Sequence, residues 1–221
     1  MTPEYCRNGS VRMALGQIYL IEDDESVRSS LFNALVQLGY NVDCFEDAES
    51  FFKQSQLRSP AVILLDMRLP DASGVDVQRR LKQMKCEVPV VFMSGLAESV
   101  EIIAAMRQGA FDFLIKPFAV EQLLIVLNQA LDKDAQQQEL VARYDRLGKA
   151  FGALTPREKQ ICLEMLDGKT NKQIAQQSGT VASTIKLHRA RVLDKMGAQS
   201  LADLIEMFKG VDKNAFSQTR F

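Results

Sequence analysis

The sequence predicts two domains: a doubly wound, five-stranded parallel α/β sheet, followed by a smaller domain built from helices. Three observations support this prediction. Short apolar runs alternate with amphipathic stretches in the first part of the chain, as in parallel sheets covered by helices on both faces. Helix start and stop signals cluster in the last third. The charge also changes sign, because 149–209 carries 10 Lys/Arg and 6 Asp/Glu whereas the rest of the chain carries 17 and 22.

Length and composition exclude several classes of protein. A chain of 221 residues with 47% hydrophobic and 25% charged residues is typical of a globular protein of one large or two modest domains. No apolar stretch approaches the roughly 18–20 residues that span a bilayer, and no secretory leader is found. Four widely spaced cysteines and a single histidine argue against disulfides, zinc sites and Ser-His-Asp chemistry. We therefore expect a cytoplasmic protein that uses carboxylates or phosphate.

The elements of the first domain follow from its periodicity. Five short apolar runs are the expected strands, at 17–21, 40–45, 61–65, 89–93 and 111–115. The expected helices lie near 26–38, 47–56, 74–85, 97–108 and from 119 onward. Gly39 and Gly109 each follow a helical stretch, where a left-handed residue would end the helix.

The domain limits follow from changes in composition. We place the first domain at 16–132, a linker at 133–152 and the second domain at 153–210. Helical spacing of the few apolar residues in the linker predicts that the last helix continues into it, although a solvated spacer fits equally well. The ends, 1–15 and 211–221, are expected to be poorly ordered tails.

Polar side chains gather at the carboxyl ends of the predicted strands. Glu22 and Asp23 follow the first strand, and Asp66 ends the third. Because ligands of open α/β sheets bind beyond these strand ends, the three acids are expected to lie together. Crowded carboxylates favour a hard divalent cation such as Mg²⁺. Ser94 and Lys116, at the ends of the next two strands, add a hydroxyl and an ammonium, which together predict a site for an aspartyl phosphate.

Four motifs in this region, IEDDESVR, LLDMRLP, FMSG and FLIKPF, closely resemble the receiver domain of two-component response regulators, which has a flavodoxin-like fold. The resemblance covers Gly16 to about Leu131. It implies that Asp66 accepts a phosphoryl group from a histidine kinase. It also implies a Mg²⁺ site formed by the residues that match the family's metal ligands, namely Glu22, Asp23, Asp66 and the backbone carbonyl of Arg68.

The same resemblance implies the path of the signal. Ser94 would hydrogen-bond the phosphoryl group, Lys116 would neutralise its charge, and Phe113 matches the aromatic switch position, although an ordinary core role is at least as plausible for Phe113. Two departures stand out. Glu22 replaces the commoner Asp, and Arg68 places a long side chain beside the site, where it could alter the rate of phosphate loss.

The second domain reads as three short helices in a helix-turn-helix arrangement. Thr155, Pro156 and Glu158 form a capping-box signal for the first helix. Asn171 is the expected cap of the second helix, which ends near Gly179. The third helix carries a cationic face that matches a phosphate backbone, although an ordinary solvated face would look alike.

The motifs LTPREKQI, GKTNKQIA and TIKLHRARVLDKMG, between Leu154 and about Met207, are similar to the LuxR-type DNA-binding domain. The resemblance implies that the third helix enters the major groove of double-stranded DNA. The base-facing candidates are Lys186, Leu187 and Ala190. The candidates for phosphate or core contacts are Lys172, Thr184, His188, Arg189 and Arg191.

Two details of this domain stay open. Val181 stands where the family usually has a Ser cap, so either Thr180 or Ser183 would have to compensate or the start of the helix would shift. A fourth helix starts at Ser200 and runs to about Phe208; it is expected either to dimerise on DNA, as in relatives, or to complete the core.

The sequence as a whole resembles FixJ-like response regulators, non-enzymatic transcription factors activated by phosphorylation. The implied partners are a cognate histidine kinase, promoter DNA and a second copy of the chain, with RNA polymerase as a further candidate. One alternative is a transcription factor whose receiver domain serves only for dimerisation, independent of phosphate. The other is an aspartyl-phosphate phosphatase, which is disfavoured because such enzymes usually carry a second Asp where this chain has Arg68.

Overall fold

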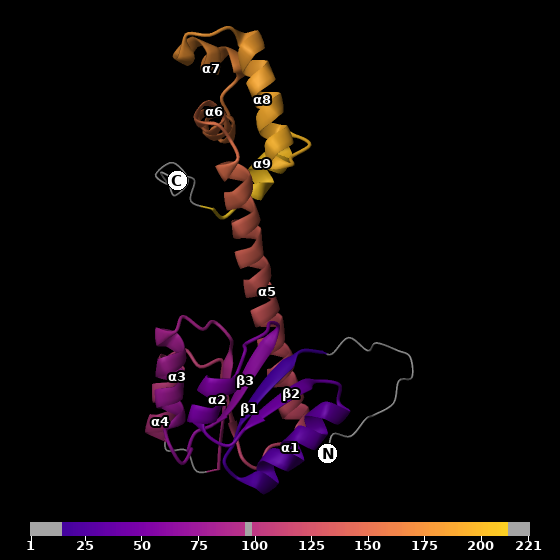
Figure 1. The fold of residues 1–221 in the computed structure, drawn as a ribbon, viewed down its shortest axis with the longest axis vertical. Helices are drawn as coiled ribbons and strands as arrows, with labels where there is room; N and C mark the ends of the chain where they lie inside the picture. The colour runs from indigo at the N-terminus through magenta and orange to yellow at the C-terminus, as the bar shows by residue number, and fades with distance from the viewer. Residues whose placement is uncertain (1–14, 96–98, 212–221) are drawn as a thin grey trace. The chain divides into compact units, whose positions relative to one another are not determined.

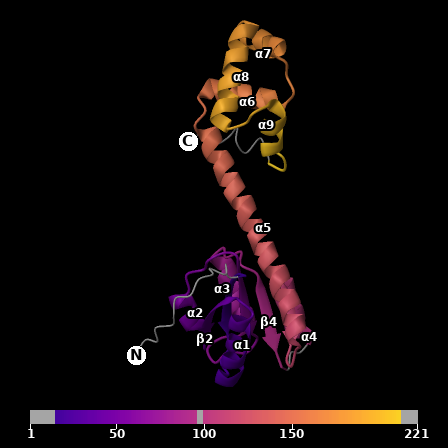
Figure 2. The same cartoon turned by 90° about the vertical axis from the view of Figure 1, so that its right-hand side faces the viewer.

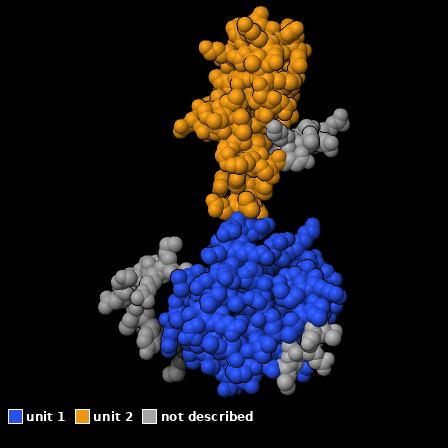
Figure 3. Space-filling model, turned by 180° about the vertical axis from the view of Figure 1, so that it is seen from behind, with its two compact units in different colours: residues 1–138 blue, residues 139–221 orange. Residues whose placement is uncertain are grey.

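The computed structural model describes residues 15–95 and 99–211, with the side chains of 96–101 left out. The chain divides into two compact units, 1–138 and 139–221 (Figure 3). The two predicted tails lie almost entirely outside the described residues. Among the described residues, no helix combines the length and the apolar character needed to cross a membrane.

Unit 1 contains a parallel sheet of five strands in the order β2-β1-β3-β4-β5. The strands are β1 (Gln17–Ile21), β2 (Asn41–Phe45), β3 (Ala61–Asp66), β4 (Val90–Ser94) and β5 (Asp112–Ile115). Every residue of β3 and β4 is buried, which explains why these strands read as continuous apolar runs rather than alternating ones. This strand order is that of flavodoxin-like folds, so the predicted fold class is confirmed.

Helices cover both faces of the sheet (Figure 1). One face carries α2 (Ala48–Gln54), α3 (Gly74–Gln83) and α4 (Ser99–Arg107), and the other carries α1 (Glu25–Gln37) and α5 (Val120–Gly152). Alternate strand residues feed the two cores: Tyr19 and Ile21 face one core, and Ile18 and Leu20 face the other. The loops at the carboxyl ends of the strands are left at the sheet edge, where they can form a site.

The expected linker, 133–152, forms the C-terminal part of one 33-residue helix, α5. Leu123 and Leu127 in its first half pack into the core of unit 1, and Leu147 and Phe151 near its end pack into the core of unit 2. Along the chain, the boundary between the two compact units falls between Gln138 and Glu139, inside this helix.

Unit 2 also contains α6 (Pro156–Leu166), α7 (Asn171–Ser178), α8 (Ala182–Met196) and α9 (Leu201–Met207). Figure 2 shows α8 beside α6 and α7, with which it packs. The capping box of Thr155 and Glu158 is present as predicted. The predicted cap of α7 was wrong by one residue: Thr170 is the N-cap and forms a second capping box with Gln173, which makes Asn171 the first helical residue.

The N-terminus of α8 has no side-chain cap. Val181 occupies the N-cap position with an extended backbone and 64% exposure. Among the described residues, the hydroxyl of Thr180 pairs with the hydroxyl of Ser178 at 3.0 Å and not with an amide of α8. Ser183 provides no cap hydrogen bond either, among the described residues. Within the described part of the chain neither residue compensates, so no described side chain accepts from the first amides of α8, a loss that typically costs about 1 kcal/mol.

Candidate functional site

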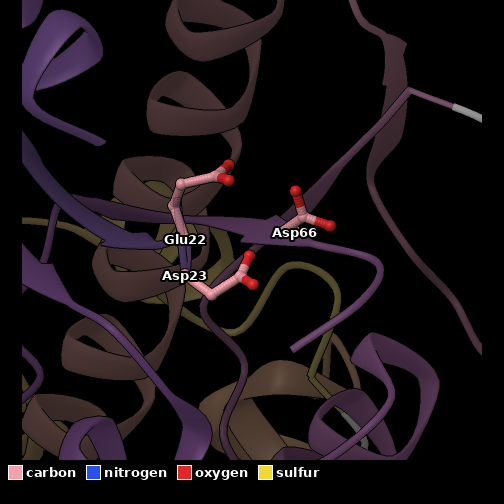
Figure 4. A group of neighbouring side chains, drawn as sticks. All are labelled: Glu22, Asp23 and Asp66. Atoms are coloured by element: carbon pink, nitrogen blue, oxygen red, sulfur yellow. The ribbon is translucent and has the colours of Figure 1, made fainter. Parts of the chain in front are cut away.

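The three predicted acids meet at the carboxyl edge of the sheet (Figure 4). Glu22 and Asp23 follow β1, and Asp66 ends the adjacent strand β3, in register with it. One carboxylate oxygen from each lies within 4.8 Å of the others. Glu22 and Asp66 are buried, at 1% and 8% exposure, whereas Asp23 is exposed. The cluster is therefore open on the Asp23 side.

Lys116 reaches this cluster from the end of β5, two strands away from Asp66. Its Nζ donates to Glu22 Oε2 at 2.6 Å and also forms an ion pair with Asp66 Oδ2. The other oxygen of Asp66 accepts the backbone N–H of Arg68 at 2.8 Å. The Arg68 residue is exposed beside the site. Both oxygens of Asp66 are thus oriented by groups that carry positive charge or donate hydrogen bonds.

The electrostatics of the cluster leave an excess of negative charge. Burial raises the pKa of Glu22 to about 7, an effect that the charge of Asp66 reinforces and the ammonium of Lys116 opposes. Burial lowers the pKa of Lys116, but its hydrogen bonds to Asp66 and Glu22 outweigh this, and the net shift is upward. Three carboxylic side chains face one ammonium, and all the atoms that could bind a metal are hard oxygens. The residues present therefore fit a divalent cation of the Mg²⁺ type.

Ser94 and Phe113 lie at the same edge but differ in environment. Ser94 ends β4 with 3% exposure, and its carbonyl accepts the backbone N–H of Lys116 at 2.8 Å. Phe113 lies in β5, half-buried against the core formed with α2, α3 and α4. Residues 96–98, which follow Ser94 in the loop after β4, lie outside the described residues.

Arg28 is a residue of the site that the sequence did not reveal. Its guanidinium Nη1 donates to the carbonyl oxygens of Glu22 at 2.6 Å and Asp23 at 2.9 Å. The neighbouring Asp24 caps α1 by accepting the amides of Ser26 and Val27. Two sets of hydrogen bonds therefore join the loop that carries the acids to the first turn of α1. The only available signal was an Arg five and six residues after the acids, which places it on that turn.

The predicted DNA-contacting residues separate into two groups. The exposed residues are Lys172 at the start of α7 and, on α8, Thr184, Lys186, Leu187, Ala190 and Arg191. The two half-buried residues are His188 and Arg189. Arg189 donates to the carbonyl of Lys169 at 3.1 Å, which joins α8 to the turn before α7.

A second cation of α8, Lys195, also contacts another helix of the same unit. Lys195 forms a 2.7 Å ion pair with the buried carboxylate of Glu158, at the start of α6. Lys195 thereby joins the last turn of α8 to the capping box of α6. Lys195 is itself exposed, so the exposed cations of α8 that make no such contact with a described residue are Lys186 and Arg191.

A flavodoxin-like domain with an acid, hydroxyl and lysine cluster, joined to a helical domain with an exposed cationic helix, defines a class of regulator that couples a receiver to DNA binding. Residues 18–128 match the family model of the response regulator receiver domain. Residues 152–208 match that of bacterial regulatory proteins of the luxR family. The chain therefore belongs to the transcriptional response regulators with a LuxR-type DNA-binding domain, as predicted.

Relatives resemble the chain over most of its length. Response regulator protein TodT of Pseudomonas putida is 33% identical over 204 residues, which cover 91% of this chain and 90% of TodT. Transcriptional regulatory protein FixJ of Bradyrhizobium diazoefficiens is 32% identical over 194 residues, which cover 87% and 94%. The solved structure of response regulator StyR matches with a TM-score of 0.79 at 33% identity and covers 87% of this chain and 98% of StyR.

Proposed function

We propose that Asp66 accepts a phosphoryl group from a histidine kinase and that its phosphorylation controls binding of promoter DNA by α8. The observation that carries the proposal is that Asp66 lies close to Lys116, Glu22 and Asp23 at one edge of the sheet. A structural ion pair would need one carboxylate for one ammonium. Three carboxylates around one lysine, two of the acids buried, suit a site that also receives a cation and a phosphoryl group.

In the proposed reaction, a carboxylate oxygen of Asp66 attacks phosphorus in line with the phosphohistidine leaving group. The new P–O bond forms as the P–N bond breaks, and the imidazole nitrogen keeps the electron pair and takes up a proton. Glu22, Asp23, Asp66 and the Arg68 carbonyl would hold Mg²⁺, which supplies charge neutralisation for the phosphoryl oxygens. Lys116 adds a second positive charge, and Ser94 can donate a hydrogen bond to the product.

Arg28 acts in this proposal as a positioning residue. It touches neither the phosphoryl group nor the acids' carboxylates. Instead, it fixes the two peptide groups that carry Glu22 and Asp23. Positioning of this kind matters because a metal site requires its ligands in a defined arrangement.

The proposed output is a dimer that binds paired half-sites about one helical turn apart. Exposed Lys186, Leu187 and Ala190 on α8 would face the bases, and Lys172, Thr184 and Arg191 would contact phosphates. Phe113 would rotate inward when Ser94 binds the phosphoryl group, although its present packing also suits a core residue.

The test compares the full-length wild type with Asp66→Asn, each with and without Mg²⁺ and a small phosphodonor such as acetyl phosphate. Size is measured by light scattering and DNA affinity by titration at fixed salt. We expect only the phosphodonor-treated wild type to gain one phosphate, dimerise and bind DNA more tightly. Equal behaviour of the two proteins would instead support a receiver domain that dimerises independently of phosphate.

A further inference from the structure

The loop between β3 and α3, residues 67–73, forms a compact unit beside the acid site. Its two ends are joined, because the backbone N–H of Gly74 donates to the carbonyl of Met67 at 2.8 Å. A Cβ atom at Gly74 would lie 2.9 Å from the carbonyl oxygen of Asp66, so this end of the loop packs closely against β3. The loop carries Arg68, whose backbone N–H orients Asp66. Its orientation at the sheet edge depends on the contacts that it makes with other elements.

Asp71, in the same loop, contacts the start of α2. Its Oδ1 accepts the backbone N–H of Ala48 at 3.1 Å, and its Oδ2 accepts that of Glu49 at 2.9 Å. The N-cap residue Asp47 accepts the next amide, that of Ser50, at 2.7 Å. Two carboxylates therefore cap one seven-residue helix, and one of them comes from the loop after β3.

The segment that leads into α2 is also joined to the loop that carries the acids. The backbone N–H of Glu22 donates to the carbonyl of Phe45 at 3.1 Å, and Phe45 ends β2 three residues before α2 begins. Hydrogen bonds thus connect the loop of Glu22 to the start of α2, and the start of α2 to the loop of Arg68. The second of these connections is made by Asp71.

We propose that Asp71 is a positioning residue for the metal site. This role rests on the proposed function, in which the carbonyl of Arg68 is a ligand of Mg²⁺. A carboxylate ligand can adjust by rotating its side chain, whereas a backbone carbonyl moves only with its peptide chain. The position of the Arg68 carbonyl therefore depends on what holds the loop, and so does the N–H that orients Asp66.

The geometry of the contact distinguishes three side chains at position 71. An aspartate offers one oxygen to each of two amides, at the end of α2 where the helix dipole favours negative charge. An asparagine has a single acceptor oxygen and an alanine has none. Substitutions at this position should therefore weaken the connection between the loop and α2 in two steps.

The experiment compares the full-length wild type with Asp71→Ala, Asp71→Asn and Asp47→Ala. Mg²⁺ affinity is measured by calorimetry without a phosphodonor, and the melting temperature is measured without Mg²⁺. Asp47→Ala is the matched control, because it removes one negative charge and one cap from the same end of α2 but no hydrogen bond to the loop of Arg68.

We expect Asp71→Ala to bind Mg²⁺ about tenfold more weakly than the wild type, as for other groups that orient metal ligands. Asp71→Asn should fall between the two, and Asp47→Ala should keep the affinity of the wild type. The melting temperature should fall in both alanine variants, because each loses a helix cap. In Asp71→Ala, the Mg²⁺ concentration that half-saturates phosphorylation should rise, while the rate at saturating Mg²⁺ stays near that of the wild type.

Failure of this role differs from failure of the proposed function. If the wild type binds no Mg²⁺, or if Asp66→Asn takes up phosphate as the wild type does, the proposed function is wrong and the role of Asp71 falls with it. If the wild type binds Mg²⁺ but Asp71→Ala binds it as tightly, or if Asp47→Ala loses as much affinity, Asp71 is only a helix cap. Should Asp71→Ala not fold, an affinity of Asp71→Asn equal to that of the wild type overturns the role.

Discussion

The acid site of unit 1 and the cationic helix α8 of unit 2 use charge in different ways. At the acid site, charged groups are largely buried and hold one another, so Lys116 contacts both Glu22 and Asp66. On α8, the cations divide between two tasks: exposed Lys186 and Arg191 contact no described carboxylate, whereas half-buried Arg189 and exposed Lys195 bind groups of the same unit. The charged residues counted in the sequence describe the acid site well. On α8 the same count overstates the number of cations available to DNA.

The largest expected effect comes from breaking the acid site. Lys116→Met removes the ammonium from two buried carboxylates, so we expect phosphorylation by a small phosphodonor to slow by about 10²-fold or more. The variant should also lose stability, because an uncompensated buried charge remains. Added Mg²⁺ should therefore raise its melting temperature more than that of the wild type. Equal Mg²⁺ shifts in the two proteins would contradict the proposed cation site.

Arg28→Lys sharpens the comparison, because it keeps the charge near the acids but its side chain ends one bond short of Nη1, the atom that donates to both carbonyls. We expect Mg²⁺ affinity, measured by calorimetry, to fall by about tenfold, as for other groups that orient metal ligands. The half-saturating Mg²⁺ concentration for phosphorylation should rise, while the maximal rate changes little.

The control for Arg28 is Arg79→Lys, an exposed arginine of α3 paired with Asp76. A loss of melting temperature in Arg28→Lys with unchanged Mg²⁺ affinity would reduce Arg28 to a purely structural role.

On α8, a matched pair of substitutions separates the two groups of cations. Arg191→Ala should weaken DNA binding and change the slope of log affinity against log salt by up to about 0.9, because it removes a proposed phosphate contact, while the melting temperature stays unchanged. Lys195→Ala should lower the melting temperature of unit 2, because Glu158 loses its ion pair, and leave the salt slope unchanged. A reversed outcome would mean that Lys195 is a DNA contact.

The same division explains how much the sequence could predict. Apolar runs, and glycines at the ends of helical stretches, were sufficient to predict the sheet. The rule that ligands bind beyond the carboxyl ends of parallel strands was sufficient to predict that Glu22, Asp23 and Asp66 lie together. The buried position of Asp134, whose Oδ2 accepts the backbone N–H of Ala61 at 2.9 Å, was not identifiable, because the residue lies in a polar stretch that resembles a solvated linker, and its burial depends on how α5 meets β3. The cap of α7 was misplaced because Thr170 and Asn171 are both competent caps, and only the backbone decides between them.

Acid should unfold unit 2 partly through Glu158. The hydrogen bond from Lys195, followed by that from the Thr155 amide, lowers the pKa of Glu158 to about 2 from its ordinary 4.5. Because the folded pKa is the lower one, its contribution to stability is full above pH 4.5 and is lost as the pH falls toward 2. Glu158→Gln should therefore lower the melting temperature at pH 7 and flatten its decline between pH 4.5 and 2. A parallel decline in both proteins would exclude this linkage.

The smallest effect is expected at the start of α8, where Val181→Ser supplies the missing cap. Val181 is 64% exposed, so little packing is lost, while a serine oxygen can accept an amide of the first turn. The gain should be about 1 kcal/mol, equivalent to a rise of roughly 4–8 °C in the melting temperature of a domain of this size. Val181→Ala controls for loss of the β-branched side chain. If both variants melt alike, the amides at this helix end are already satisfied by water, and the uncapped start of the recognition helix carries no energetic cost.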